Sequence, residues 1–256
     1  MATSESGSRL LQEACDELAR QGCTLAIGPM DGSTWGSYRY ITGGTDAPAF
    51  FLEPSNPPEL PAQFVTFGFT PLAVYRSTLV DHLDSHDPKA DRAERKLVAR
   101  GIKLRVLEKD RLTDELKAVF RISLEAFQNG FLYQPVSEAE FLASHERLTP
   151  FVRPELVLIA MHDDREVGFI FAIPDLLQAR RGEKVDTVII KTLAILPERE
   201  LAGLGVYMVR QLHRIANSLG YRRVIHALMH ESNGSLNISS RYSRHFRRYT
   251  LFSKKL

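Results

Sequence analysis

The stretch Lys191-Thr-Leu-Ala-Ile-Leu-Pro-Glu-Arg-Glu-Leu-Ala-Gly-Leu-Gly-Val-Tyr-Met-Val-Arg210 indicates a strand, a glycine loop and a helix in direct succession. The apolar run stops at Pro197, Gly203 and Gly205 follow, and apolar residues then recur at helical spacing as far as Leu219. Such a loop can direct several backbone N–H groups at one point, beside the positive end of a helix dipole. Glycine also lets a ligand approach the backbone closely. The stretch therefore predicts an anion site of the kind that pyrophosphate groups occupy.

A Gly-x-Gly pair before a helix can also do no more than close a tight turn. The Gly-Lys-Ser/Thr of a Walker loop does not follow here, and the third glycine of the dinucleotide fingerprint is missing. Taken alone, the loop is compatible with both an anion site and a tight turn without a ligand. The flanking sequence is needed to distinguish them.

In its context the stretch resembles the central motif of the GNAT superfamily, the GCN5-related N-acyltransferases. That motif is a strand, a Val/Leu-x-Pro turn, and Arg/Gln-x-x-Gly-x-Gly/Ala at the start of a helix. Leu196-Pro197 and Gly203-x-Gly205 stand at the family's spacing. The chain departs from the motif three residues before the first glycine, where it has Glu200, with Arg199 one residue earlier.

The order of expected elements also resembles the family over about residues 100–256, and implies an α/β fold with a mixed sheet. Ser137 and Glu140 form a capping box, Asp163-Asp164 a strand-to-strand turn and Gly220 a helix end. Strands are expected at 102–108, 156–161, 167–173, 187–196, 223–227 and 246–252, the last alternating like an edge strand, and helices at 112–127, about 137–148 and 205–219.

The first 99 residues contain a similar but shorter pattern. Helices are expected at 10–19 and 57–67, and strands at 24–27 and 71–75. Asn56 before a helix that ends in Gly68-Phe69 resembles the last third of a GNAT fold. We therefore predict a degenerate GNAT-like half at 1–99, without a phosphate loop, before a GNAT domain at 100–256. An unrelated α/β extension is the alternative, and the charged segment 81–100 reads as a solvated linker or an exposed helix.

The composition is that of an ordinary soluble protein. Of 256 residues, 44% are hydrophobic and 25% are charged, and no apolar run approaches the length of a membrane span. The two cysteines, Cys15 and Cys23, lie beside apolar residues and are expected to be buried free thiols in a reducing compartment. These features favour a cytoplasmic location.

Charge is distributed unevenly although the net charge is only +2. From residue 199 onward the sequence has eleven basic residues and two acidic ones. Because the whole chain has a net charge of only +2, the residues before 199 are net acidic. A positive field around the glycine loop suits the phosphates of coenzyme A, or an acidic acyl carrier protein as partner. Nucleic acid is disfavoured because no nucleic-acid motif accompanies the basic residues.

The resemblance implies acetyl-CoA or a longer acyl-CoA as co-substrate. In the family, a backbone N–H of the strand before the loop lies near the thioester carbonyl, backbone N–H groups of the loop hold the pyrophosphate, and an Asn opens a later helix. The corresponding residues here are Leu193, Ala194 and Ile195, then Leu201, Ala202, Gly203, Leu204, Gly205 and Val206, and finally Asn233.

Three side chains are candidates for proton transfer. Tyr242 matches the family's acid for the leaving thiolate, or it is simply a helix residue that packs on the sheet. His226 can accept the proton of the amine, or it is a core histidine with one hydrogen bond, and Glu231 is a comparable candidate. Many members of the family bind an already neutral amine and need no base. No metal site is expected, because His226 and His230 on one strand would stand about 13 Å apart.

The combined prediction is an acyl-CoA-dependent N-acyltransferase that acts on the amine of a small molecule or amino acid. The alternatives are a non-catalytic GNAT-like module that binds acyl-CoA or scaffolds a partner, and an acyltransferase that uses an acyl carrier protein. The sequence leaves the acceptor, the acyl chain length and the oligomeric state open. The acceptor pocket is expected along the first two helices of the GNAT domain, unless their aromatic residues form core: Phe127, Phe131, Leu132, Tyr133 and Phe141.

Overall fold

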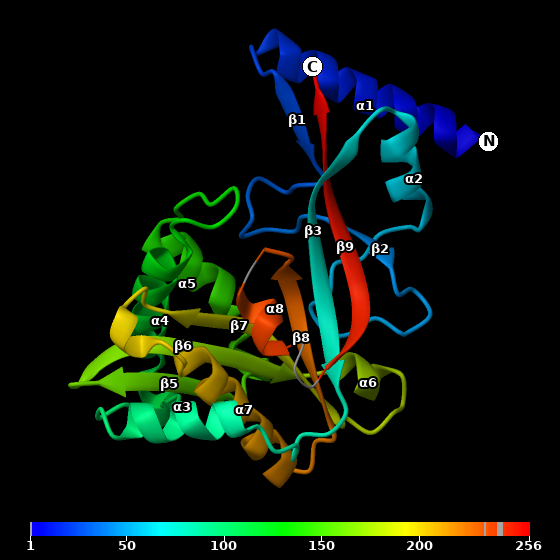
Figure 1. Ribbon diagram of the computed structural model, residues 1–256. Helices are drawn as coiled ribbons and strands as arrows, with labels where there is room; N and C mark the ends of the chain where they lie inside the picture. Colours follow the sequence, from blue (N-terminus) through cyan, green and yellow to red (C-terminus); the bar gives the residue numbers. More distant parts are fainter. Residues whose placement is uncertain (1, 233, 240–242) are drawn as a thin grey trace. The chain divides into compact units, whose positions relative to one another are not determined.

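The computed structural model describes residues 2–232, 234–239 and 243–256. The chain divides into two compact units, each discontinuous in sequence (Figure 1). The first unit comprises residues 1–77, 228–233 and 245–256, and the second comprises residues 78–227 and 234–244. The division predicted from the sequence, into 1–99 and 100–256, is of a different kind, because it rests on the resemblance of each part to the GNAT family. It stays a prediction.

The second unit is built on strands in the order β8, β7, β6, β5 and β4. These strands are Arg223–His230, of which residues 223–227 belong to this unit, then Thr187–Ile195, Arg165–Pro174, Val157–His162 and Lys103–Val106. β8 and β7 run parallel, and every later pair is antiparallel. The sheet is therefore mixed, as predicted.

The central strands of this sheet are apolar because both of their faces are covered. Ile159, Ile170 and Ile189, on β5, β6 and β7, are all fully buried. Helices α4 (Leu112–Phe127) and α5 (Glu138–Glu146) lie on one side of the sheet, and α3 (Pro88–Val98) and α7 (Leu204–Ser218) lie on the other (Figure 1). The shorter elements of this unit are α6 (Leu176–Arg180), α8 (Gly234–Ser239), η1 (Lys109–Arg111), η2 (Thr149–Phe151), η3 (Pro154–Leu156) and η4 (Arg199–Leu201).

Local signals in this unit are confirmed. The Ser137 side chain accepts a hydrogen bond from the Glu140 N–H, and the Glu140 carboxylate accepts one from the Ser137 N–H, which is the predicted capping box. Asp163 and Asp164 join β5 to β6 with φ of 48° and 59°, the left-handed conformations of a type I′ hairpin turn. Gly220 has φ of 86° and ends α7 as expected.

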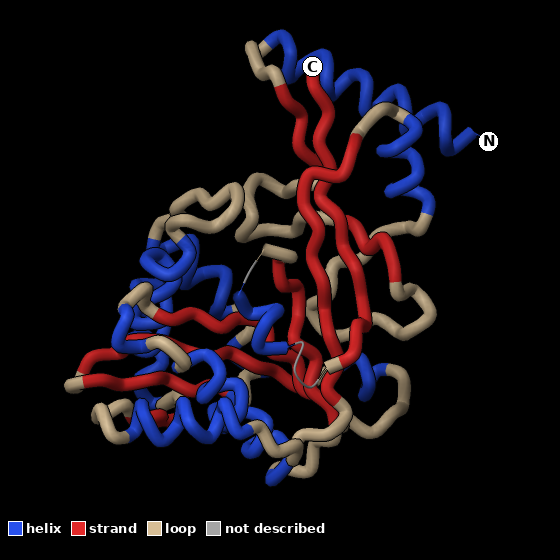
Figure 2. The backbone as a smooth tube through the Cα atoms, viewed as in Figure 1, coloured by secondary structure: helices blue, strands red, loops and turns tan. Residues whose placement is uncertain are grey.

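The first unit contains strands β1 (Leu25–Gly28) and β2 (Tyr40–Gly43), and all but the ends of β3 (Thr70–Val80) and β9 (Arg244–Lys255), of which residues 70–77 and 245–255 belong to this unit. β9 lies between β1 and β3 and also pairs with β2 (Figure 2). The prediction that the C-terminal strand is an edge strand is therefore wrong. Residues 249–253 of β9 are all buried, so both of its faces are covered there, and its partners come from the first 80 residues.

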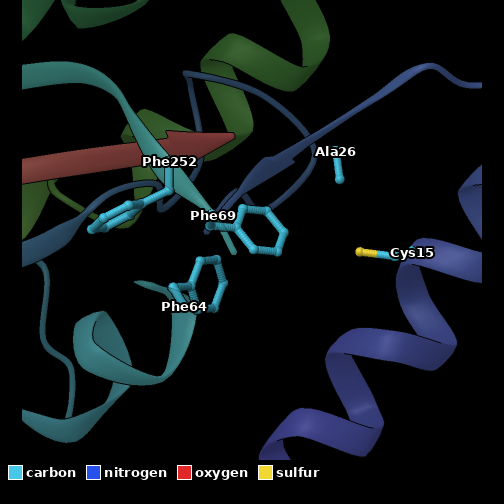
Figure 3. Close-up of a cluster of buried hydrophobic side chains, with 5 residues drawn as sticks. All are labelled: Cys15, Ala26, Phe64, Phe69 and Phe252. Atoms are coloured by element: carbon cyan, nitrogen blue, oxygen red, sulfur yellow. The ribbon is translucent and has the colours of Figure 1, made fainter. Parts of the chain in front are cut away.

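The core of the first unit forms where α1 (Ala2–Arg20) and α2 (Glu59–Thr66) approach the strands. Phe64, Phe69 and Phe252 gather there with Ala26, and Cys15 of α1 faces the same cluster (Figure 3). The Phe64 and Phe69 rings lie with centroids 4.7 Å apart. Cys15 is buried and Cys23 is exposed, both as free thiols, so the expectation of two buried cysteines holds for Cys15 alone.

A buried ion pair anchors the loop before α2 to β9. The Arg247 Nε atom donates to Glu53 Oε1 at 2.8 Å, and the two side chains are 3% and 0% exposed. Tyr249 Oη donates to the same Glu53 oxygen at 2.6 Å, and the Arg247 guanidinium also donates to the carbonyls of Ala47 and Pro48. Such a pair tolerates burial because hydrogen bonds surround both charges.

Candidate functional site

The junction between β7 and α7 forms the turn that the glycine loop predicts. After Ile195 the chain passes through Leu196-Pro197 and the short η4 helix, and α7 begins at Leu204. Gly203 stands at the N-cap position with φ of 98°, a conformation that favours glycine. Because glycine has no side chain, the start of α7 receives no side-chain cap.

The start of α7 leaves a group of backbone donors available. The N–H groups of Leu201 and Ala202 donate to the carbonyls of Glu198 and Arg199, at 3.1 Å and 3.3 Å. Within the part of the chain that the structure describes, the N–H groups of residues 203–206 have no hydrogen-bond acceptor. The first-turn N–H groups of a helix project beyond its N-terminal end and carry the positive end of its dipole. The junction is therefore suited to an anion.

The two glycines of the loop face different neighbours. A Cβ atom on Gly203 would lie 3.3 Å from the Cβ of Ala93 on α3. A Cβ atom on Gly205 would lie 3.1 Å from Ile238 Cδ1 on α8 and 3.3 Å from Ile195 Cδ1 on β7. Close packing thus favours glycine at position 205, and the backbone conformation favours it at position 203.

β7 and β8 separate in front of this junction. Their parallel pairing covers residues 187–190 of β7 and ends at the pair Ile190 and His226. β7 continues to Ile195 paired with β6 on its other side, after an irregularity at Lys191. Along Leu193–Ile195 no strand pairs with the β8 side of β7 among the described residues, so backbone groups there are open.

The structure brings the predicted strand and loop residues together. The side chains of Leu193 and Ile195 both reach the position where a Gly205 Cβ would stand, at 3.4 Å and 3.3 Å. The loop is held from outside as well, because Arg165 Nη2 donates to both carboxylate oxygens of Glu198, at 2.7 Å and 2.9 Å. Asn233, the remaining predicted cofactor residue, lies outside the described residues.

His226 lies inside the unit rather than at a surface. It is 3% exposed, and its Nε2 atom is 2.9 Å from Nε2 of His213 on α7, which is equally buried. Burial lowers the pKa of His226 to about 4, and burial together with His226 and Arg210 lowers the pKa of His213. Both imidazoles are therefore neutral at pH 7, with one ring as donor and the other as acceptor.

The other two catalytic candidates have different surroundings. Glu231, in the first unit, forms an ion pair with Arg76, whose Nε donates to Oε1 at 2.5 Å, and its side chain is 38% exposed. Tyr242 lies outside the described residues. The catalytic roles of His226, Glu231 and Tyr242 stay predictions.

The second unit has a cavity of about 750 Å³ along α4, in the region where the acceptor was expected. Phe120 and Leu124 line it together with Arg121 and Glu166, which form an ion pair at 2.8 Å, but none of the five residues predicted for the acceptor pocket lines it. Phe141 is 3% exposed and belongs to the core, whereas Phe131 is 42% exposed. The aromatic residues of this region thus divide between core and surface.

α3 has a role at the loop that its charged sequence does not predict. The segment 81–100 is expected to be a solvated linker or an exposed helix, but Ala90 and Leu97 are fully buried. Glu94 of α3 accepts hydrogen bonds from Gln211 and Arg214 of α7, at 2.7 Å and 2.9 Å. The spacing of Ala90, Ala93 and Leu97 was the available signal, because it places three apolar residues on one helix face.

The described residues contain no group of three or more His, Cys, Asp or Glu side chains arranged to hold a metal ion. Among the helices described, none has the length and apolar character that crossing a bilayer requires.

Comparisons with known proteins give the fold. The sequence matches no protein-family model, and no curated protein matches it. Among solved structures, it is similar to a GCN5-related N-acetyltransferase from Sphaerobacter thermophilus, with a TM-score of 0.54 and 17% identity over 77% of this chain and 56% of that one. It is also similar to a structure of the glucosamine N-acetyltransferase region of a fungal multi-domain β-N-acetylglucosaminidase, with a TM-score of 0.56 and 14% identity over 77% of this chain and 22% of that one. This chain thus spans little more than half the length of the first and about a fifth of the second. Together with the mixed sheet and the glycine junction, the comparisons show that the chain has a GNAT fold.

Proposed function

We propose that the chain is an acyl-CoA-dependent N-acyltransferase that acts on the amine of a small molecule or amino acid. The observation that carries the proposal is the start of α7, where the four N–H groups of residues 203–206 lack acceptors in the described chain and adjoin the open side of β7. A pyrophosphate fits such a group of donors. The GNAT fold supports the same assignment.

Two parts of the junction would bind two different parts of the co-substrate. The N–H groups of residues 203–206 would hold the pyrophosphate of acetyl-CoA or a longer acyl-CoA, whereas Leu201 and Ala202, whose N–H groups donate within the turn, would shape the loop around it. The backbone of Leu193, Ala194 and Ile195 would hold the acyl-thioester end, where an N–H directed at the carbonyl oxygen stabilises developing negative charge. When bound, the co-substrate supplies an acyl group activated as a thioester.

Proton transfer falls to side chains. Tyr242 is proposed to donate the proton of its Oη atom to the leaving sulfur, because a phenol has a pKa near that of a thiol. His226 and Glu231 stay candidates for accepting the amine proton, but each is held in another contact, with His213 and with Arg76 respectively. These contacts favour an amine that binds in its neutral form, for which no dedicated base is needed.

The same contacts favour a second candidate function. If neither His226 nor Glu231 accepts a proton and Tyr242 donates none, the loop still binds acyl-CoA, and the chain is then a sensor or scaffold rather than an enzyme. Release of the coenzyme A thiol in the presence of a panel of amines separates the two functions, because a binding module releases none.

Titration calorimetry with acetyl-CoA tests the cofactor assignment. We expect the wild-type protein to bind and Gly203→Trp to lose binding, because the indole would occupy the loop. Gly182→Trp is the matched control: Gly182 also has a positive φ, of 75°, but its Cβ position has no neighbour within 4 Å. Binding that persists in the Gly203 variant, or is absent from the wild type, contradicts the assignment.

A further inference from the structure

α3 lies against the outside of the glycine loop along one of its faces. Ala93 meets Gly203, at 3.3 Å from the position of a Cβ there, and two turns further along the chain Arg100 meets the carbonyl of Glu200. Glu94 on the same helix binds Gln211 and Arg214 of α7. α3 is thus fixed both to the loop and to the helix that follows the loop.

The position of Arg100 is set by the way α3 ends. The N–H of Ile102 donates to the carbonyl of Leu97 at 3.0 Å, and Gly101 has φ of 85°, as in a helix that closes on a left-handed glycine. Leu97 and Ile102 are 0% and 2% exposed, so the turn is anchored in the core on both sides of Arg100. The Arg100 backbone therefore cannot shift away from the loop without disturbing buried residues.

Arg100 is held at the loop by a contact with the backbone. Its Nη1 atom donates to the carbonyl of Glu200 at 3.2 Å, and among the described residues no carboxylate forms an ion pair with Arg100. A guanidinium has five N–H donors, and this contact uses one of them. Arg100 is exposed, so its other donors face solvent beside the loop.

The carboxylate of Glu200 explains why a positive side chain is useful beside the loop. An anion at the start of α7 would be attracted by the N–H groups of residues 203–206 and repelled by the carboxylate of Glu200, which is three residues before Gly203. A cation next to Glu200 offsets that repulsion. Arg100 is the basic side chain that the described structure holds against the Glu200 backbone.

We propose that Arg100, carried by the end of α3, is a phosphate-binding residue of the acyl-CoA site: it offsets the charge of Glu200 and donates to a phosphate oxygen of the co-substrate. The proposal rests on the proposed function. It assigns part of the binding energy to a helix that precedes the first strand of this sheet, far in sequence from the glycine loop.

Calorimetric titration of acetyl-CoA into four proteins tests the proposal: the wild type, Arg100→Gln, Arg100→Lys and Arg95→Gln. Arg95 is the matched control, because it is an exposed arginine on α3 two residues beyond Ala93 and so points away from the loop. We expect Arg100→Gln to weaken binding about tenfold, which corresponds to about 1.4 kcal/mol, Arg100→Lys to recover part of the loss, and Arg95→Gln to leave the Kd within about twofold of the wild type.

A salt series distinguishes a charge effect from a disturbed loop. The difference between the wild type and Arg100→Gln should shrink as the salt concentration rises from about 50 mM to about 500 mM, because exposed charges are screened. Thermal unfolding of each variant shows whether it is folded. If the wild type binds and Arg100→Gln binds equally well, or if its loss is independent of salt, the role of Arg100 is overturned and the proposed function stands. If the wild type does not bind acetyl-CoA, both proposals fall.

Discussion

His213 on α7 and His226 on β8 are joined by a hydrogen bond between their Nε2 atoms, 2.9 Å apart and almost fully shielded from solvent. The pair ties the helix that follows the glycine loop to the strand next to β7. Such a bond exists only while at least one ring is an acceptor, so both rings cannot be protonated in the native arrangement.

The pair predicts a loss of stability in mild acid. The pKa of His226 falls from 6.5 to about 4 on folding, so between these values the unfolded chain binds more protons than the folded one. The contribution of His226 to the free energy of unfolding is therefore fully present above pH 6.5 and is lost as the pH falls towards 4. The loss amounts to about 3 kcal/mol. Urea unfolding at pH 7.5, 6.5 and 5.5 measures it. His226→Gln, which cannot titrate, should show a shallower pH dependence, and an equally steep one would contradict the role of the pair.

The Glu53–Arg247 pair predicts a large effect on the first unit. Glu53→Gln leaves the Arg247 guanidinium buried without its counter-charge, and we expect the free energy of unfolding to fall by about 3 kcal/mol. Glu231→Gln is the matched control, since it breaks an ion pair whose side chains are both more than a third exposed, and its effect should stay within about 1 kcal/mol. Urea titration provides both values. Equal effects of the two substitutions would show that burial does not govern the Glu53 contact.

The proposed acid predicts a kinetic change without a binding change. Tyr242→Phe removes the Oη proton and keeps the ring, so we expect kcat for acyl transfer to fall by about a hundredfold while the Kd for acetyl-CoA is unchanged. An assay of coenzyme A thiol release measures kcat, and calorimetry measures the Kd for acetyl-CoA. Tyr207→Phe on α7 provides a control for loss of a phenol elsewhere in the same unit. A Tyr242 variant with wild-type turnover would return this residue to a packing role.

Elements with complete local signals were predicted closely. α4 begins and ends at the residues that its apolar stripe indicates, Leu112 and Phe127. The capping box at Ser137 and the Asp163-Asp164 turn depend on residues that are neighbours in the sequence, and both form as expected. The glycine junction belongs to the same class, because its strand, loop and helix start follow from a few consecutive residues.

Features that depend on distant partners were not predictable in this way. β8 was expected to end at Ala227 but continues to His230 through Leu228, which has φ of 59°. Ser77 accepts a hydrogen bond from the Leu228 N–H at 3.1 Å. The guanidinium of Arg39 lies over the rings of both Tyr38 and Tyr75, and Arg39 Nη1 donates to the Leu228 carbonyl at 3.5 Å. A single sequence does not reveal that these residues will meet. The alternative that His226 is a core histidine with one hydrogen bond matches its surroundings, but its partner His213 and the contact of Arg100 with the loop were not predictable for the same reason.

The placement of β9 has a consequence for synthesis on the ribosome. Leu25 pairs with Lys255 and Gly28 with Phe252. During synthesis β1 therefore remains unpaired until β9, more than two hundred residues later in the sequence, has been translated. Until then the Phe64 and Phe69 surface lacks the Phe252 side chain that completes its core. The second unit, whose strands β4 to β7 pair with their neighbours in sequence, can assemble while the first unit is still incomplete. Ribosome-bound chains should therefore acquire protease resistance in the second unit before the first.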